Sequence, residues 1–284
     1  MEEKNSIRVG ILGLGIIGSR IAGHLRNAGF PVAVWNRTPK AEPNFLKSPA
    51  EVAQASDVIQ LFVADPKAVF EVLDAMGDAL TSRHVIVCSS TIGRAATLEA
   101  ARRVRERGAR FLDCPFTGTR GAADKAQLVY YIGGDEETFL AAQPMLQPVS
   151  KAIVRIGAIG EAALVKVLTN IIGAASIEVL AECVAVLKAA GMDPAILTAA
   201  LEHHGNRSAL IDLKLPKLLS GDYDTHFSLK HMLKDVQFGL DEGAALKLDL
   251  PVTQAAAEAM REGMTQGWAD LDFACVMKRY PQQP

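Results

Sequence analysis

A glycine turn close to the N-terminus is the feature that most constrains the fold of this chain. The turn Gly13-Leu14-Gly15-Ile16-Ile17-Gly18 follows the apolar run Val9–Leu12 and precedes a helical pattern. In this context the first glycine allows a tight turn, the second lets the backbone approach a pyrophosphate, and the third lets the helix pack on the strand. The helix N-terminus then faces phosphate charge. All six residues of the turn are therefore predicted to bind a dinucleotide cofactor.

The end of the next strand predicts which dinucleotide is preferred. A carboxylate about 20 residues beyond the glycines accepts hydrogen bonds from the ribose 2′-hydroxyl of NAD. This chain has Asn36-Arg37-Thr38 instead. Arg37 can bind a 2′-phosphate bidentately, with Thr38 adding a hydroxyl, whereas a carboxylate would repel it. The cofactor is therefore predicted to be NADP, with residues 36, 37 and 38 in contact with it.

The first half of the chain alternates β-branched runs with helical patterns, which is typical of a parallel sheet with crossover helices. The expected strands are Ile7–Leu12, Val32–Trp35, Val58–Val63, His84–Cys88, Phe111–Asp113, Leu128–Ile132 and Ile153–Ile156. The expected helices between them are Ile17–Ala28, Pro66–Leu80, Arg94–Arg107 and Glu136–Leu146.

Beyond Gly160 the pattern becomes helical throughout. The expected helices are Glu161–Ala190, Ala195–His203, Ala209–Leu219, Leu229–Leu246, Val252–Gly263 and Leu271–Lys278. The sequence therefore predicts an α/β Rossmann-type domain, doubly wound around a mostly parallel sheet, at residues 1–160. An all-α domain for substrate binding and oligomerisation follows at residues 161–284, and a long interdomain helix joins the two.

Composition excludes several classes of protein. The 284 residues are 49% hydrophobic and carry a net charge of −2, so no nucleic-acid or membrane-attracting surface is expected. Four scattered cysteines and a start without a signal-peptide pattern favour a reducing cytoplasm. Charged residues interrupt the longest apolar stretch, which argues against a membrane span. The many apolar helices predict a homodimer or homotetramer built through the helical domain.

Lys166 is the only charge in the apolar run AALVKVLTNIIGAASI, and Asn170 follows it one helical turn later. Both polar groups then share one face of the helix. Because a buried ammonium is costly, Lys166 is expected to meet water, a counter-charge or a ligand, or else to snorkel at a helix edge.

Three other segments carry groups that could place a substrate. Ser90-Thr91 follows the fourth expected strand, and Asp113-Cys-Pro-Phe-Thr117-Gly118-Thr119 follows the fifth, where open α/β sheets bind ligands. Residues 117–119 can direct N–H groups and hydroxyls at a small anion. Lys230 and Lys234 share a helix face at four-residue spacing.

Taken together, these segments resemble the β-hydroxyacid dehydrogenases, the family that includes 3-hydroxyisobutyrate dehydrogenase. The resemblance spans nearly the whole chain. The residues around Arg37 and the segment Phe227–Asp235 point to the NADP-preferring glyoxylate/succinic semialdehyde reductase branch. Thr117 and Thr119 replace the family's serine and second glycine, and the segment between Thr38 and Pro49 is shorter than the usual crossover helix.

The resemblance implies an NADPH-dependent oxidoreductase that reduces a short aldehyde or keto acid to the hydroxy acid. It implies that Lys166 donates the proton and that Asn170 assists it. The resemblance also implies cofactor contacts at Val63, Ala64, Thr91 and Lys234, and substrate contacts at Ser90, Thr117, Gly118, Thr119, Lys230 and Asp235.

Two alternatives remain open. An imine reductase shares this architecture but commonly has another residue at the lysine position, and an NADPH-binding regulator would not need Lys166 or Asn170. No metal is expected, because His203, His204, His226 and His231 lack a ligand spacing and are expected at exposed helix ends.

Overall fold

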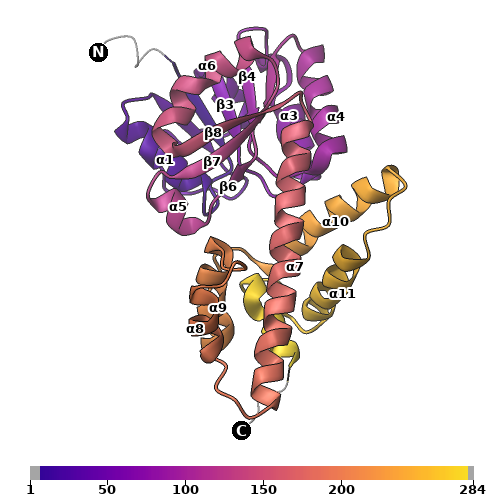
Figure 1. The fold of residues 1–284 in the computed structure, drawn as a ribbon. Coiled ribbons are helices and arrows are strands. Elements are labelled where there is room, and N and C mark those ends of the chain that lie inside the picture. The colour runs from indigo at the N-terminus through magenta and orange to yellow at the C-terminus, as the bar shows by residue number, and fades with distance from the viewer. Residues whose placement is uncertain (1–6, 281–284) are drawn as a thin grey trace. The chain divides into compact units, whose positions relative to one another are not determined.

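The computed structural model describes residues 7–280 of the chain, which divides into two compact units, Met1–Lys166 and Val167–Pro284. The division lies inside the long helix α7 (Glu161–Ala189), whereas the sequence prediction put it at residue 160. Figure 1 traces the chain through both units, which are described separately below.

The first unit is built on a mostly parallel sheet, as predicted. Its strands lie in the order β2-β1-β3-β4-β5-β7-β6, and β8 pairs with β7. Strands β1 to β5 are parallel, while β7 runs antiparallel to β5 and β6. The strands are β1 (Val9–Leu12), β2 (Val32–Trp35), β3 (Val58–Leu61), β4 (Val85–Cys88), β5 (Arg110–Asp113), β6 (Phe116–Thr117), β7 (Leu128–Gly133) and β8 (Ser150–Gly157).

Helices cover both faces of this sheet. They are α1 (Gly18–Asn27), α2 (Pro49–Ala55), α3 (Pro66–Met76), α4 (Gly93–Glu106), α5 (Arg120–Asp124) and α6 (Glu136–Leu146), with short 3₁₀ turns at Gly77–Ala79 and Gln147–Val149. Side chains cap several of them: Asp65 accepts a hydrogen bond from Ala68 N, and Asp135 accepts one from Thr138 N. The sequence did not predict α2, α5 or the two-residue strand β6.

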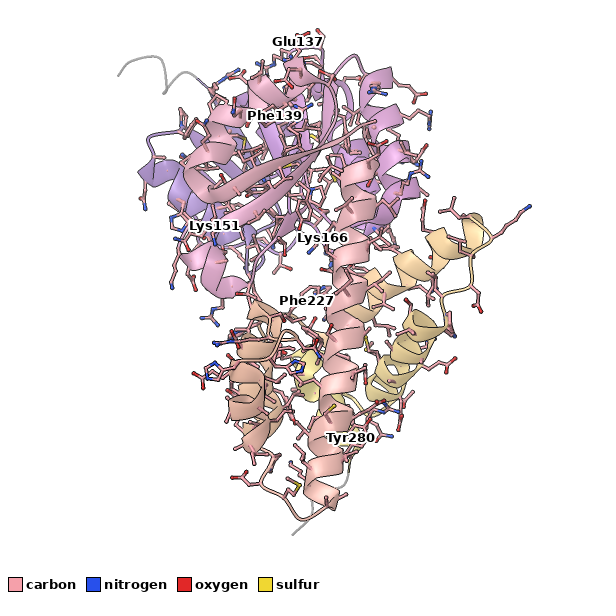
Figure 2. The ribbon with its side chains drawn as sticks, viewed as in Figure 1. Glu137, Phe139, Lys151, Lys166, Phe227 and Tyr280 are labelled. Carbon is pink, nitrogen blue, oxygen red and sulfur yellow. The ribbon has the colours of Figure 1, made fainter. Side chains whose placement is uncertain are left out.

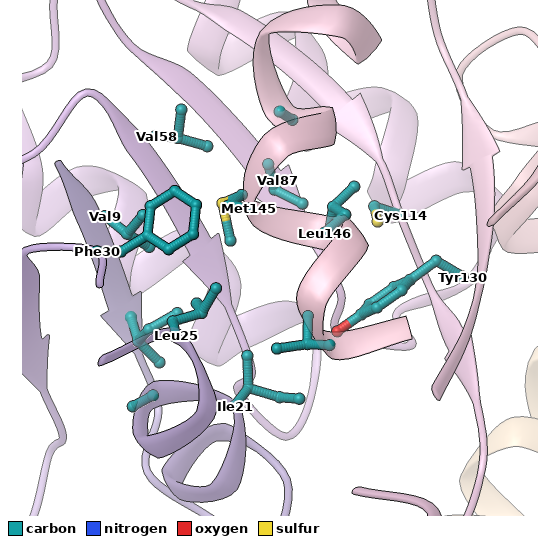
Figure 3. Packing of buried hydrophobic residues seen from close by; sticks show 14 of the residues in the cluster. Val9, Ile21, Leu25, Phe30, Val58, Val87, Cys114, Tyr130, Met145 and Leu146 are labelled. Carbon is teal, nitrogen blue, oxygen red and sulfur yellow. The ribbon is translucent and has the colours of Figure 1, made fainter. Parts of the chain in front are cut away.

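Two hydrophobic cores lie on opposite faces of the sheet, because successive strand residues point to opposite sides. Val9 and Ile11 pack with α1 and α6, whereas Leu12 packs with α3 and α4. Figure 3 shows the first of these cores, in which Phe30 and Met145 face one another across the layer. This packing confirms the doubly wound arrangement.

The second unit is helical, as predicted. Beyond the part of α7 that belongs to it, it contains α8 (Ile196–Glu202), α9 (Ala209–Ser220), α10 (Leu229–Ala245) and α11 (Pro251–Thr265). The last element, expected as an α-helix at Leu271–Lys278, is instead a 3₁₀ helix, η4 (Phe273–Arg279). The Asp272 carboxylate caps η4 by accepting a hydrogen bond from Ala274 N. It also accepts hydrogen bonds from His226 N, Phe227 N and Lys214 Nζ, which fix the start of η4 to α9 and to the segment before α10.

Helix α7 forms the centre of the second unit's core. Ala174, Ile177, Ala181 and Val184 are fully or almost fully buried against residues of α9, α10 and η4. Among the described helices, α7 is the one that is long and apolar enough to cross a membrane by length and composition. One face of α7 packs in the core of the second unit, whereas Ile172, Val179 and Val186 on the same helix are exposed.

Candidate active site

The glycine turn after β1 has the shape that a dinucleotide requires. Gly13 has φ +102°, and a Cβ atom there would lie 2.4 Å from the Phe62 carbonyl oxygen. A Cβ atom on Gly18 would lie 2.0 Å from the Gly13 carbonyl oxygen, so α1 could not pack this closely with any other residue. A Cβ atom on Gly15 would meet nothing within 4 Å, and Gly15 and Ile16 are exposed. The turn therefore leaves open space above Gly15, where a pyrophosphate fits.

The residues after β2 support the turn and add positive charge beside it. Asn36 Oδ1 accepts a hydrogen bond from Leu14 N at 2.9 Å, and Asn36 Nδ2 donates to the Thr38 carbonyl at 2.7 Å. Arg37 is exposed, and within residues 7–280 its guanidinium has no hydrogen bond or ion pair. Lys40, which sequence reasoning missed, donates from Nζ to the Leu14 carbonyl at 2.5 Å. Its position only three residues after Arg37 was the available signal.

Ser90, which is predicted to contact the substrate, makes hydrogen bonds within the protein. Its hydroxyl accepts a hydrogen bond from Val63 N at 2.9 Å and lies 3.4 Å from the Leu61 carbonyl oxygen. Ser90 thus ties the loop after β4 to the loop after β3, where Ala64 is exposed and Val63 half-buried. Thr91 follows Ser90 and is half-buried at the same edge of the sheet.

The segment expected to bind a carboxylate lies between β6 and α5. Thr117 is half-buried and ends β6, and Thr119 precedes the first residue of α5. Gly118 has φ +137°, and a Cβ atom there would lie 2.8 Å from Leu128 Cδ2. Only glycine therefore allows the chain to turn at this point.

Asp113, at the end of β5, is only 2% exposed. Its Oδ2 accepts hydrogen bonds from Gly160 N at 2.9 Å and Ala163 N at 3.0 Å. Burial raises the pKa of this carboxyl to about 7, against the opposing effect of these N–H donors. Sequence reasoning placed Asp113 in a substrate motif and missed these contacts, which join residues about 50 positions apart.

Helix α7 carries both predicted catalytic residues one turn apart. Lys166 is 8% exposed and is labelled on α7 in Figure 2. Asn170 is half-buried, and its Nδ2 donates a hydrogen bond to Asp235 Oδ2 at 2.6 Å. Lys234 Nζ lies 3.1 Å from Asp235 Oδ1 and 5.0 Å from the centre of the Phe238 ring. In the second unit the structure therefore brings together three predicted site residues: Asn170, Lys234 and Asp235.

Lys230, also a predicted site residue, pairs with a different carboxylate. Its Nζ lies 2.5 Å from Asp270 Oδ1 on the exposed side of α10. His231 is half-buried in the first turn of α10, with Nδ1 2.8 Å from Ser228 Oγ, so the expected exposed position was wrong for this histidine. Residues 7–280 contain no group of three or more His, Cys, Asp or Glu side chains that could hold a metal ion.

The predicted sites of the first unit share one edge of its sheet. The glycine turn, residues 36–38, residues 63–64 and residues 90–91 each follow the carboxyl end of a parallel strand. In open α/β sheets this edge is where ligands bind. The arrangement can hold a dinucleotide along strands β1 to β4 and a small anion beside β6.

Comparison with known proteins agrees with this geometry. The NAD binding domain of 6-phosphogluconate dehydrogenase matches residues 8–157, and the NAD-binding domain of NADP-dependent 3-hydroxyisobutyrate dehydrogenase matches residues 160–280. The 3-hydroxyisobutyrate dehydrogenase of Mycobacterium tuberculosis, solved with L-serine, superposes with a TM-score of 0.87 at 25% identity, covering 96% of this chain and 98% of that one.

Two kinds of relative stand out by sequence. The chloroplastic glyoxylate/succinic semialdehyde reductase 2 of Arabidopsis thaliana is 29% identical over 98% of this chain and 80% of its own length. The cytokine-like nuclear factor N-PAC of Mus musculus is 28% identical over 96% of this chain. The match covers 51% of the length of N-PAC. With the family matches covering residues 8–157 and 160–280, the chain belongs to the 3-hydroxyisobutyrate dehydrogenase-related family of NAD(P)-dependent oxidoreductases, which act on the CH–OH groups of hydroxy acids.

Proposed function

We propose that this protein is an NADPH-dependent reductase that converts a short aldehyde or keto acid, of the glyoxylate or semialdehyde type, to the hydroxy acid. One observation carries the proposal. A buried lysine, Lys166, lies one helical turn before Asn170, whose amide is held by Asp235. A lysine retained in so apolar a helix needs a role that offsets the cost of its burial.

The preference for NADPH is supported by the residues beside the glycine turn. Arg37 is exposed and its guanidinium has no partner within residues 7–280, so it can bind a 2′-phosphate without breaking an existing contact. Asn36 is occupied with Leu14 and Thr38, so its part is to shape the turn. Lys40, whose Nζ donates to the Leu14 carbonyl, adds a second cation beside the glycine turn.

The chemistry of the chain's own residues follows from their types and places. A bound nicotinamide supplies the hydride. The Lys166 ammonium donates a proton to the oxygen that becomes the hydroxyl and stabilises the negative charge that develops there. Asp235 accepts a hydrogen bond from the Asn170 amide nitrogen, and the Asn170 side chain is proposed to orient Lys166 or a substrate hydroxyl.

A carboxylate on the substrate is expected to bind at the turn formed by Thr117, Gly118 and Thr119. The positive φ of Gly118 turns the backbone sharply, and both threonines bring hydroxyls to the same short segment. N–H groups and hydroxyls in such a turn suit a small anion. The carboxylate would thereby orient the carbonyl carbon for reaction.

We also propose that the protein is a homodimer or homotetramer joined through its helical unit. Most of its exposed large apolar side chains lie there: Leu168, Ile172, Val179, Val186, Met192, Ile196, Leu246, Leu248 and Val252. Apolar surface gathered on one unit is typical of a protein interface.

Two other functions compete with this one. An imine reductase would reduce a C=N bond and would not need a carboxylate, and a non-catalytic NADPH-binding regulator would bind cofactor without turnover. The presence of both Lys166 and Asn170 favours an enzyme that donates a proton to oxygen.

The test is NADPH oxidation by the purified protein with glyoxylate, succinic semialdehyde, tartronate semialdehyde and methylmalonate semialdehyde. Propanal serves as the control without a carboxylate, and a cyclic imine as the control for C=N reduction. The proposal expects turnover with at least one acid and little with propanal, because the orienting contacts are lost. Efficient turnover of the imine, or of propanal at the rate of succinic semialdehyde, would contradict it.

A further inference from the structure

Asp113 belongs to the segment that leads to the proposed carboxylate-binding turn, but its own carboxylate faces elsewhere. It is buried at the end of β5, where it pairs with Cys88 on one side and Gly133 on the other. Its Oδ2 accepts hydrogen bonds from Gly160 N at 2.9 Å and from Ala163 N at 3.0 Å. These contacts engage one oxygen of the Asp113 carboxylate with the start of α7.

The two donors belong to the start of α7. The first N–H groups of a helix have no partner within the helix, and a carboxylate there also meets the positive end of the helix dipole. In α2, α3 and α6 of this unit a neighbouring side chain meets that need, as Asp135 does three positions before Thr138 in α6. Helix α7 is capped instead by Asp113 at the end of β5, which lies 47 and 50 positions before the two donors in the sequence.

The Asp113 carboxylate has little room to move. A Cβ atom added to Gly133 would lie 3.1 Å from Asp113 Oδ2 and 2.5 Å from the Ala158 carbonyl oxygen. Glu161 closes the other side of the same loop, because its Oε2 accepts a hydrogen bond from Ala158 N at 2.9 Å. The first turn of α7 is therefore fixed to the end of β5.

The bonds between Asp113 and the start of α7 connect Lys166 with the turn at Thr117–Thr119. The proposed function needs a fixed distance between these two groups. Ala163 lies three residues before Lys166, so the bound N–H is about 4.5 Å from it along the helix axis. Thr117 lies four residues after Asp113 on the chain that leaves β5. We propose that Asp113 is a positioning residue, which sets where Lys166 stands relative to the carboxylate-binding turn at Thr117–Thr119. The inference rests on the proposed function and uses contacts within the first unit alone.

The test begins with Asp113→Asn, which keeps an oxygen acceptor but loses the charge. Asp135→Asn is the matched control, because Asp135 also caps a helix by its side chain, and that helix, α6, carries no proposed site residue. We expect Asp113→Asn to lower kcat about 10–100-fold, the effect of a misplaced reacting group, and to leave NADPH affinity unchanged. Asp135→Asn should leave kcat within about twofold, as expected for a change confined to folding stability. If Asp113→Asn does not fold, Asp113→Ser takes its place, since a serine hydroxyl also caps helices.

A double variant separates positioning from a purely structural effect. If Asp113 acts through Lys166, adding Asp113→Asn to Lys166→Ala should lower kcat by less than about threefold further, because the group being positioned is already gone. An equal loss of kcat in both backgrounds would overturn the inference, as would wild-type kcat in Asp113→Asn. Wild-type kcat in Lys166→Ala alone would refute the proposed function, so the two failures are distinguishable.

Discussion

At the scale of single residues, the proposed chemistry depends on a few side chains whose surroundings differ sharply. Lys166 is buried in an apolar helix, whereas Arg37 is exposed beside the glycine turn. Because burial strengthens electrostatic interactions and exposure weakens them, the first is suited to act on a reacting atom and the second to select a ligand.

Replacing Arg37 by Ala should raise the Michaelis constant for NADPH about 10–100-fold, since a charge-assisted contact of roughly 1.5–3 kcal/mol is lost. The kinetics with NADH should hardly change, because NADH lacks the 2′-phosphate. Initial rates with both cofactors measure this directly, and equal losses with NADPH and NADH would show that Arg37 supports the fold instead.

At the scale of elements, the second unit is held by charges buried between its helices. Lys214 on α9 and Asp272 beside η4 have side chains 1% and 0% exposed, and Lys214 Nζ lies 2.6 and 2.8 Å from the two carboxylate oxygens. The ammonium also lies 4.3 Å from the centre of the Phe273 ring. Burial lowers the pKa of Lys214, and Asp272 opposes that shift.

Lys214→Met should therefore lower the free energy of unfolding by about 3–5 kcal/mol, because it leaves the Asp272 carboxylate buried without its counter-charge. Lys67→Met is the control, since Lys67 pairs with Glu71 on an exposed face and should cost less than about 1 kcal/mol. Urea unfolding of both variants measures the difference. Comparable costs would contradict the role given to the buried pair.

Glu178 on α7 makes the stability of the second unit depend on pH. Burial raises its pKa to about 7, with Glu182 and Glu262 adding to the shift and Arg279, 3.6 Å away, opposing it. For a carboxyl whose pKa is raised on folding, the stabilisation is complete below the ordinary value of 4.5 and is lost as pH rises through 7.

Glu178→Gln should therefore reduce the fall in unfolding free energy between pH 5 and pH 8 by up to about 3 kcal/mol. Glu182→Gln, on the exposed side of the same helix, should reduce that fall much less, because Glu182 adds less to the pKa shift of Glu178 than burial does. Urea unfolding at the two pH values tests both variants, and the same pH dependence in Glu178→Gln as in the wild type would contradict the assignment.

The elements also mark where sequence reasoning works and where it stops. Strands β1 to β4 were predictable because they are rich in β-branched residues that are buried, and α7 because its apolar pattern ends at a glycine. Helix α5 was not, since Arg120-Gly-Ala-Ala-Asp124 has too few apolar residues to give a period. The pairing of Asn170 with Asp235 spans 65 residues, and no local pattern encodes such a contact.

At the scale of the whole molecule, exposed apolar side chains gather on the helical unit. Ile172 and Val186 on α7 are each 67% exposed, and Val252 at the start of α11 is 66% exposed. We expect multi-angle light scattering to give a mass of two or four chains at micromolar concentration. A stable species of 30.4 kDa would contradict the proposed oligomer.

The measurement that tests the central claim most directly is single-turnover oxidation of NADPH by Lys166→Ala, beside NADPH titration of the same variant. If Lys166 donates the proton, the chemical step should slow about 100–10,000-fold, the usual contribution of a general acid. Cofactor affinity should survive, because the glycine turn and Arg37 remain. Lys166→Arg should fail nearly as badly, since its high pKa makes it a poor acid. A Lys166→Ala enzyme that oxidises NADPH at the wild-type rate would contradict the account.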